Sequence, residues 1–174
     1  MRAYKTEIDP TPSQIELIHK TFGCTRYIYN HFVSENLENL ASDNDFISAF
    51  EYSKRVNNDP NTPTWMKEVP SKAVKQALMY ADRAFKEYFS KRRGKPTFKK
   101  KGSSESFYLI GTIKVERHRI FVPKLKWVRL KEFGYIPKNI SSVTISMKNG
   151  RYYISCLCKD EVDERIPLSD YSMG

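Results

Sequence analysis

The chain has 174 residues, of which 40% are hydrophobic and 13% aromatic, and its formal net charge is +10. This length suits one medium domain or two small ones with a real core, and the charge favours a polyanionic partner. No segment approaches the ~20 consecutive apolar residues of a membrane span, and the N-terminus has no apolar signal-peptide core. Three cysteines without disulfide spacing fit a reducing cytosol, so we expect a cytoplasmic protein with no membrane partner.

Positive charge is concentrated in the second half of the chain. Residues 21–60 hold three basic and six acidic side chains, whereas residues 92–101 hold six basic side chains and no acidic one. Phosphates bind Lys and Arg, and unpaired bases stack on rings, so a basic chain with 11 Tyr and 10 Phe points first to nucleic acid. An ordinary surface helix with a solvated basic loop would produce the same pattern, and both interpretations remain open on this stretch alone.

The first part of the chain predicts one strand followed by helices. Residues 2–8 alternate apolar and polar side chains, as in a short strand. Thr11 is expected to cap a helix, with Gln14 completing a capping box and Gly23 ending the helix. A second helix from about residue 25 would then form a helix-turn-helix, although most helical hairpins simply pack.

Two further helices are predicted before the β-rich part of the chain. A short helix is expected from about residue 48 to 56, and a turn cluster follows at residues 57–63. Trp65 and Met66 are expected to plug the helical core. The longest helical pattern begins at Ser71, and its apolar side chains recur at three- and four-residue steps.

After Lys101 the hydrophobic period changes to two, which predicts a series of short strands. Asn149-Gly150 marks the clearest hairpin. The first strand has no partner nearby and is expected to pair with the late strands. We therefore predict an α+β fold, in which both ends of the chain form a small β-barrel and a helical bundle is inserted between them.

No constellation of residues predicts catalysis or a cofactor site. The three histidines are far apart, and Cys156-x-Cys158 has too short a gap for a structural zinc site, so core packing beside Ile154 is the expected role of these cysteines. Paired carboxylates, a glycine-rich phosphate loop and a nucleophile elbow are all missing. We expect this chain alone to bind a partner and to catalyse no reaction.

The order of several segments resembles the amino-terminal half of the TnpB (OrfB) family of transposon-encoded RNA-guided DNA nucleases, which are related to type V CRISPR effectors. Each segment alone is weak evidence for this resemblance, but together and in this order the segments cover nearly the whole chain. They are RAYKTEIDPTPSQIELI at the start, FGCTRYIYNHF at 22–32, WMKEVPSKAVKQALMYADRAFKEYF at 65–89, GKPTFKKK at 94–101, SFYLIGTIKVERHRIFVPKLKWVRL at 106–130 and SVTISMKNGRYYISCLC at 142–158.

The resemblance implies a domain organisation and a function. Residues 1–10 and 97–160 would form a β-barrel "wedge" domain, residues 11–96 an inserted helical recognition lobe, and residues 161–174 an acidic linker. The family binds a guide RNA made from the transposon end, recognises a short transposon-adjacent motif in double-stranded target DNA, and cuts it with a two-metal nuclease domain. Protein contacts would read the short motif, and base pairing would read the rest.

The resemblance also implies a departure from the family. A strand of the form G-[IV]-D-x-G, whose Asp is the first metal ligand in the family, would begin where this sequence ends. The nuclease carboxylates and the later zinc-binding insertion are therefore expected to be absent, as in a fragment or a truncated gene product. A divalent metal is expected only in the missing nuclease domain, which could exist as a separate nuclease half.

Site residues follow from the resemblance position by position. DNA-motif recognition is assigned to the start of the long helix, the short helix before it and the loop before the strand at 112–116: Tyr52, Ser71, Lys72, Lys75, Gln76, Gly111 and Thr112. Contact with the guide RNA or the RNA–DNA heteroduplex is assigned to the basic run, its one ring and two strand lysines: Arg92, Arg93, Lys95, Phe98, Lys99, Lys100, Lys101, Lys114 and Lys126.

Two other functions remain open at this point. The chain could be a stand-alone helix-turn-helix DNA-binding protein that acts as a repressor or a transposon accessory protein. It could also be a truncated fragment with a basic surface and no retained function.

Overall fold

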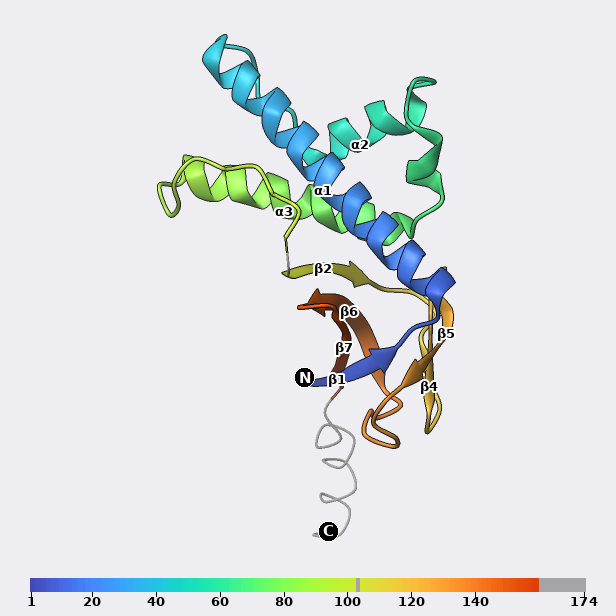
Figure 1. Cartoon of the computed structure of the whole chain (residues 1–174). Coiled ribbons are helices and arrows are strands. Elements are labelled where there is room, and N and C mark those ends of the chain that lie inside the picture. Colours follow the sequence, from blue (N-terminus) through green and yellow to red (C-terminus); the bar gives the residue numbers. More distant parts are fainter. Residues whose placement is uncertain (103, 160–174) are drawn as a thin grey trace, which may run out of the picture.

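The computed structural model describes residues 1–102 and 104–159. Within these residues three α-helices and a short 3-10 helix lie over one end of a curved antiparallel sheet (Figure 1). The elements in chain order are β1 (Arg2–Asp9), α1 (Pro12–Ala41), α2 (Ala49–Asn58), η1 (Thr64–Lys67), α3 (Ser71–Phe89), β2 (Ser104–Leu109), β3 (Lys114–Val115), β4 (Arg119–Val122), β5 (Lys126–Leu130), β6 (Ile140–Lys148) and β7 (Arg151–Cys158).

The seven strands form one sheet in the order β2-β6-β7-β1-β5-β4-β3. The predicted combination of helices and strands is therefore confirmed. The predicted barrel is not, because these pairings leave β2 and β3 as unpaired edges in the described part of the chain. The sheet nevertheless curls around one core, since Leu109 of β2 and Ile120 of β4 belong to the same buried cluster although their strands lie far apart in the strand order.

The first strand occupies the centre of this sheet. β1 pairs with β7 from Arg2 to Ile8 and with β5 at Ile8 and Asp9, which confirms the predicted pairing with late strands. The β6–β7 hairpin turns at Asn149 and Gly150, whose φ angles are 52° and 78°. Positive φ at both central residues is what this tight turn requires, and Asn-Gly tolerates it. Cys156 and Cys158 are buried in the core, as expected from their packing role.

α1 begins as predicted but does not end at Gly23. Thr11 and Gln14 form the full capping box, and the helix is 30 residues long, from Pro12 to Ala41. The prediction of two helices with a joint at Gly23 is therefore wrong as a description of this segment. Gly23 lies between Phe22 and Cys24, which are both buried, so tertiary packing on both sides holds the residue in the helix despite its low helix propensity.

A second buried cluster joins the helices to one another. Ile28, Phe32 and Val33 of α1 pack with Leu78, Ala81 and Phe85 of α3, while Tyr52 and Met66 close the cluster from α2 and η1. The ring of Phe32 contacts both Tyr52 and Phe85. The predicted starts of α2 and α3 and the plugging role of Met66 are confirmed. Phe89, the last residue of α3, is 46% exposed.

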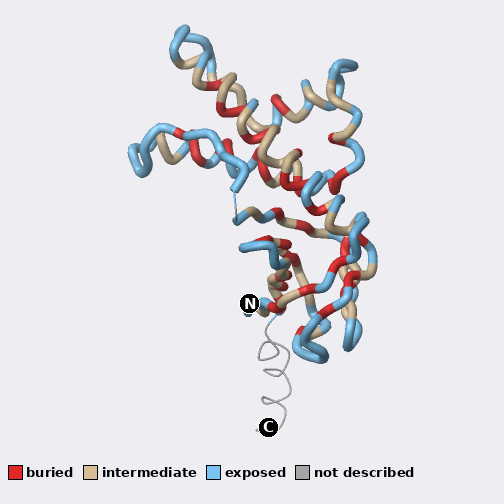
Figure 2. Tube along the Cα trace, in the orientation of Figure 1, coloured by how far each residue is buried: buried red, intermediate tan, exposed pale blue. Residues whose placement is uncertain are grey.

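The helical part and the sheet meet along the first half of α1 (Figure 2). Phe22 of α1 packs edge-on against Phe107 of β2 at 5.4 Å between ring centroids. Arg26 forms an ion pair with Glu105 of β2, and the Gln14 side chain donates to the backbone carbonyls of Leu125 and Trp127. In the described part of the chain, no helix combines the length and hydropathy that crossing a membrane needs. The predicted acidic linker at 161–174 lies outside the described residues, and the domain boundaries stay a prediction.

Candidate nucleic-acid interface

The segment of residues 92–101, here called the basic segment, leaves the end of α3 and returns beside the helices toward β2 (Figure 1). The reversal begins at Lys91, whose φ is 63°, and the backbone N–H groups of Arg92 and Arg93 both donate to the carbonyl of Glu87. Pro96 is buried, while the other residues of the segment are exposed. The six basic side chains are thus carried on a segment without helix or strand that lies on the protein surface.

Asn30 of α1 fixes the end of the basic segment. Its side-chain Nδ2 donates to the carbonyl oxygen of Lys99 at 2.9 Å, and its Oδ1 accepts from the backbone N–H of Lys99 at 2.7 Å. The carboxamide therefore pairs with Lys99 as a neighbouring β-strand would. These contacts join residues 69 positions apart and give the segment a fixed position on α1.

The Lys99 side chain is held as well. Its Nζ lies 4.5 Å from the centroid of the Tyr29 ring. Although the accessible surface of Lys99 as a whole is that of an exposed residue, its ammonium group lies among protein atoms, and this desolvation lowers its pKa. The cation–π contact compensates part of that desolvation, since the ring face attracts the positive charge.

The other cations of the basic segment project into solvent. Arg93 has an ion-pair partner, Glu87, at 3.2 Å. For the remaining four, no ion pair is found with any part of the chain that the structure describes; these are Arg92, Lys95, Lys100 and Lys101. Phe98 is 52% exposed between them, so the segment presents a ring among charges that are not neutralised. This combination can contact a phosphate backbone and stack one base.

The start of α3 presents its predicted site residues on two different sides. Ser71, Lys72 and Lys75 line a cavity toward α2 and the turn that follows it, whereas Gln76 lines a separate cavity toward β2. Pro70 precedes the helix and supplies no side-chain cap, and the first turn carries no acidic residue. The first N–H groups of α3 and two lysines therefore leave this end of the helix electropositive.

The three remaining motif residues differ in their surroundings. Tyr52 is only 6% exposed and packs on Phe32, and burial raises the pKa of its phenol to about 12. Its role in DNA contact stays a prediction, which its burial disfavours. Gly111 has a φ of 127°, a conformation that L side chains rarely adopt, so the turn itself requires glycine there. Gly111 and Thr112 are both exposed at the start of the β2–β3 connection.

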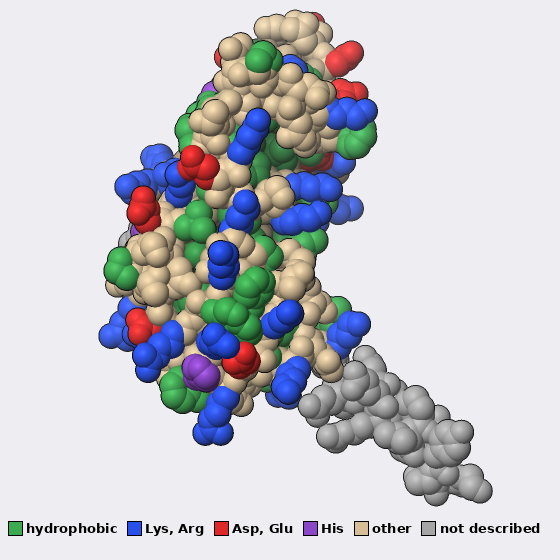
Figure 3. Space-filling view, turned by 90° about the vertical axis from the view of Figure 1, so that its right-hand side faces the viewer, with side chains coloured by type: hydrophobic (Ala, Val, Ile, Leu, Met, Phe, Trp, Pro, Cys, Tyr) green, Lys and Arg blue, Asp and Glu red, His purple; other side chains and the backbone are tan. Residues whose placement is uncertain are grey.

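The β4–β5 hairpin carries a second basic surface. The Arg119 guanidinium lies 4.1 Å from the Trp127 ring centroid and makes two hydrogen bonds to Glu116, at 2.9 and 3.0 Å. Arg129 lies opposite Arg119 in the pairing, and Phe133 and His118 line the same hollow. The predicted contacts Lys114 and Lys126 are exposed on β3 and β5. Figure 3 shows Lys and Arg side chains along this side of the molecule with few acidic ones between them.

Sequence reasoning missed two groups of side chains at this interface. Asn30 and Tyr29 have no local signal, because their partner Lys99 lies on another element. The Arg119–Trp127 pair could have been found from the period-two alternation, which places Arg119, Phe121, Trp127 and Arg129 on the outer face of one hairpin.

Metal binding has no support in the described ranges, 1–102 and 104–159. Within them no group of three or more His, Cys, Asp or Glu side chains could hold a metal ion. The three cysteines are buried, and burial raises the pKa of the Cys24 thiol to about 11 and that of Cys156 to about 12. Both thiols therefore remain protonated at neutral pH, which suits packing and not ligation.

Comparisons with known proteins agree with the resemblance stated above. Residues 1–45 match the helix-turn-helix domain of the OrfB/IS605 type. The whole chain aligns at 29% identity with "Putative RNA-guided DNA endonuclease InsQ" of Escherichia coli (strain K12), and 92% of it aligns at 27% identity with a Streptomyces pristinaespiralis protein of the same description. The chain spans 44% and 42% of the length of these two relatives. Over its whole length, the chain thus resembles one part of the TnpB (OrfB)-type proteins.

Proposed function

We propose that this chain is the guide-RNA and target-DNA binding part of a TnpB-like RNA-guided DNA endonuclease. The observation that carries this proposal is the basic segment, which Asn30 docks on α1 through the backbone of Lys99. It presents the exposed ring of Phe98 and four cations that have no ion-pair partner among the described residues. A positively charged surface segment that is docked at Lys99 suits a polynucleotide, because part of its ordering is complete before binding. The names of the two aligned relatives support the same class of function.

The start of α3 and the basic segment that follows this helix would have different roles. The electropositive start of α3, with Ser71, Lys72 and Lys75, would contact the DNA motif adjacent to the target. The basic segment would contact the guide RNA or the heteroduplex. Cleavage would require carboxylates and a divalent metal supplied by a nuclease domain, on the same or a separate polypeptide, and the chain as given would bind without cutting.

The alternative of a stand-alone helix-turn-helix DNA-binding protein is favoured by the family match at residues 1–45. The charges of α1 oppose it. α1 carries two basic and three acidic side chains and buries nine residues, whereas α3 carries four basic and two acidic side chains and leads into six further cations. A recognition helix in a DNA groove needs an exposed, basic face, and α1 does not offer one.

A binding assay over a series of salt concentrations tests the proposal. Labelled RNA from the transposon end, a scrambled RNA and duplex DNA would each be titrated with the purified chain, and fluorescence anisotropy would report the dissociation constants. The proposal predicts tighter binding of the transposon-end RNA than of the scrambled RNA, with a steep salt dependence. Binding of duplex DNA alone would favour the helix-turn-helix alternative. Mixing the chain with a separately expressed nuclease half, followed by a cleavage assay, would show whether the two parts work together.

A further inference from the structure

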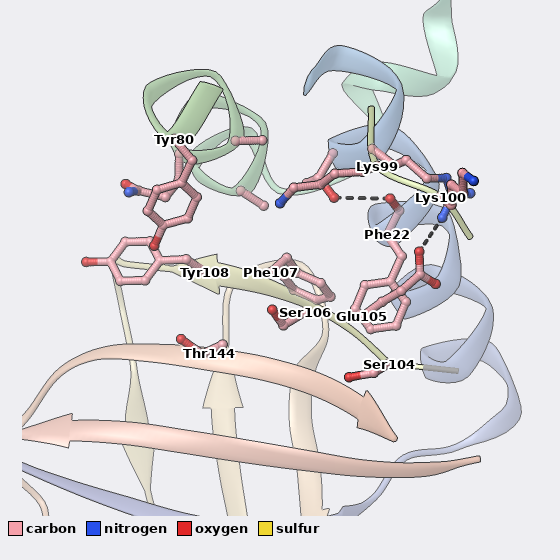
Figure 4. Close-up of a pocket in the computed structure, with 15 residues that line it drawn as sticks. Phe22, Tyr80, Lys99, Lys100, Ser104, Glu105, Ser106, Phe107, Tyr108 and Thr144 are labelled. Carbon is pink, nitrogen blue, oxygen red and sulfur yellow. Dashed lines mark hydrogen bonds and ion pairs between the residues drawn. The ribbon is translucent and has the colours of Figure 1, made fainter. Parts of the chain in front are cut away.

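A cavity of about 360 Å³ lies between α1, α3 and β2, where the helical part of the protein meets the sheet (Figure 4). Its volume falls within the ~300–1,000 Å³ range of small-molecule sites. Three elements far apart in the sequence build its walls, so the cavity exists only in the folded chain. Its chemistry differs from that of the basic segment, because rings and hydroxyl groups line it together with the cations.

The floor of the cavity is aromatic. Phe22 and Phe107 pack edge to face beneath it and are both nearly fully buried. Tyr80 of α3 and Tyr108 of β2 stand together at one end in Figure 4, and Tyr80 is 43% exposed. A flat ligand with polar edges would find the tyrosine rings beside it, while the buried Phe22–Phe107 pair supports the cavity from below.

Hydrogen-bonding groups follow the β-sheet side of the cavity. The hydroxyl groups of Ser106 and Thr144 come from the paired strands β2 and β6, and the carboxamide of Gln76 comes from α3. These groups both donate and accept hydrogen bonds, as the edges of a nucleobase require.

The charge on the cavity lining is positive. Three cations and one carboxylate line it, which gives a net charge of +2. Arg26 is already paired with Glu105, and the Lys99 ammonium lies over the Tyr29 ring. Lys100 has no ion-pair partner among the residues that the structure describes, and it stands opposite the tyrosine end in Figure 4. Lys100 is therefore the cation available to an incoming anion.

We propose that this cavity binds one unpaired nucleotide, with the base against Tyr80 and Tyr108 and the phosphate on Lys100. The inference rests on the proposed function and deepens it, because it assigns one nucleotide of the bound polymer to a defined place. A paired base in a duplex cannot enter without extrusion, so the ligand is a nucleotide from a single-stranded stretch or one already flipped out. Either the RNA or the DNA strand can supply it.

Photocrosslinking tests the proposal on the full chain. 4-Thiouridine or 4-thiothymidine is placed at successive positions of transposon-end RNA and of single-stranded DNA, and crosslinked peptides are identified by mass spectrometry. We expect crosslinks from one or two adjacent positions to the peptides that contain Tyr80 or Tyr108. If the RNA probe gives these crosslinks, the nucleotide comes from the RNA; if the single-stranded DNA probe gives them, it comes from the DNA. Tight binding with crosslinks spread elsewhere in both arms would overturn the cavity assignment and leave the proposed function standing.

Variants provide a second readout. Tyr80→Ala should weaken binding about tenfold, the effect of losing one base–ring stack, whereas Tyr80→Phe should stay within about twofold of the wild type. Tyr135→Ala serves as the matched control, because Tyr135 is a tyrosine of similar exposure, 41%, outside the cavity. Equal losses in Tyr80→Ala and Tyr135→Ala would overturn the assignment. If the unmodified chain bound no nucleic acid at all, both the cavity assignment and the proposed function would fall.

Discussion

The carboxamide of Asn30 pairs with the backbone of Lys99 through two hydrogen bonds of 2.9 and 2.7 Å, and thereby docks the basic segment on α1. A loop rich in like charges would otherwise repel itself and sample many conformations. Docking at Lys99 keeps Lys100, Lys101 and Phe98 at one place on the surface. Part of the conformational entropy that these side chains would lose on binding a polynucleotide is therefore already lost in the free protein.

Asn30→Ala should weaken RNA binding by about three- to tenfold, because the basic segment loses its anchor and must be ordered on binding. The free energy of unfolding should fall by no more than about 1 kcal/mol, since water can satisfy the exposed Lys99 backbone. Anisotropy titration and thermal unfolding would measure the two quantities. Asn39→Ala, which removes a carboxamide from the far end of α1, is the control. Full RNA affinity in Asn30→Ala would show that the docking has no role in binding.

Charge reversal of Lys99, Lys100 and Lys101 to Glu should weaken RNA binding and flatten its salt dependence. Each lost phosphate contact lowers the slope of log K against log salt by about 0.7 for a single strand, so three contacts account for about 2 units. Reversal of Lys138, Lys148 and Lys159 changes the net charge by the same amount on another part of the surface. If both triple variants kept the wild-type slope, the basic segment would not be a contact surface.

Tyr52 should make the stability of the fold sensitive to alkaline pH. Burial raises the pKa of its phenol to about 12, above the unfolded value of about 10. The folded state thus holds this proton more tightly than the unfolded state does. The protonated phenol therefore makes its full contribution to the free energy of unfolding below pH ~10, and this contribution is lost as the pH rises toward ~12. Tyr52→Phe should lose less stability than the wild type between pH 10 and 12 in urea unfolding. Parallel curves for the two proteins would contradict this assignment.

Asp82 of α3 should stabilise the start of α2. Its carboxylate is buried, accepts from the backbone N–H of Ala49 at 2.8 Å and pairs with Lys86 at 2.8 Å. Asp82→Ala leaves the partly buried N–H of Ala49 without its partner and should lower the free energy of unfolding by about 1–3 kcal/mol. Lys86→Ala removes only the ion pair between Asp82 and the exposed Lys86 side chain, and it should lower the free energy of unfolding by less than about 1 kcal/mol. Equal losses in the two variants, measured by urea unfolding, would assign the effect to the ion pair.

Elements with local signals could be predicted from the sequence. The Thr11–Gln14 capping box, the Asn149-Gly150 turn and the start of α3 at Ser71 each depend on residues within a few positions, and all three are confirmed. The prediction at Gly23 was wrong because burial of both neighbouring residues, Phe22 and Cys24, outweighed the low helix propensity of glycine. Whether the sheet closes into a barrel could not be predicted from the sequence. Alternating apolar and polar residues predict strands, but not whether the two edge strands pair with each other.

The candidate interface was only partly predictable for the same reason. The basic segment is visible as a run of charges, but its docking requires Asn30, which lies 69 residues away and carries no pattern of its own. Likewise, the four predicted site residues at the start of α3 lie within six consecutive positions, yet the fold turns Gln76 toward β2 and Lys72 toward α2. Which cavity a side chain enters is decided by tertiary packing, which residue spacing alone does not specify.

Trypsin footprinting tests the central claim most directly, because five cleavage sites lie in the basic segment, where Pro96 blocks cleavage only after Lys95. The chain would be digested briefly alone, with transposon-end RNA and with duplex DNA, and the peptides quantified by mass spectrometry. We predict that RNA protects the sites from Arg92 to Lys101 in preference to those at Lys138, Lys148 and Lys159. Protection by duplex DNA alone, confined to residues 12–40, would contradict the proposed function and support a helix-turn-helix DNA-binding protein.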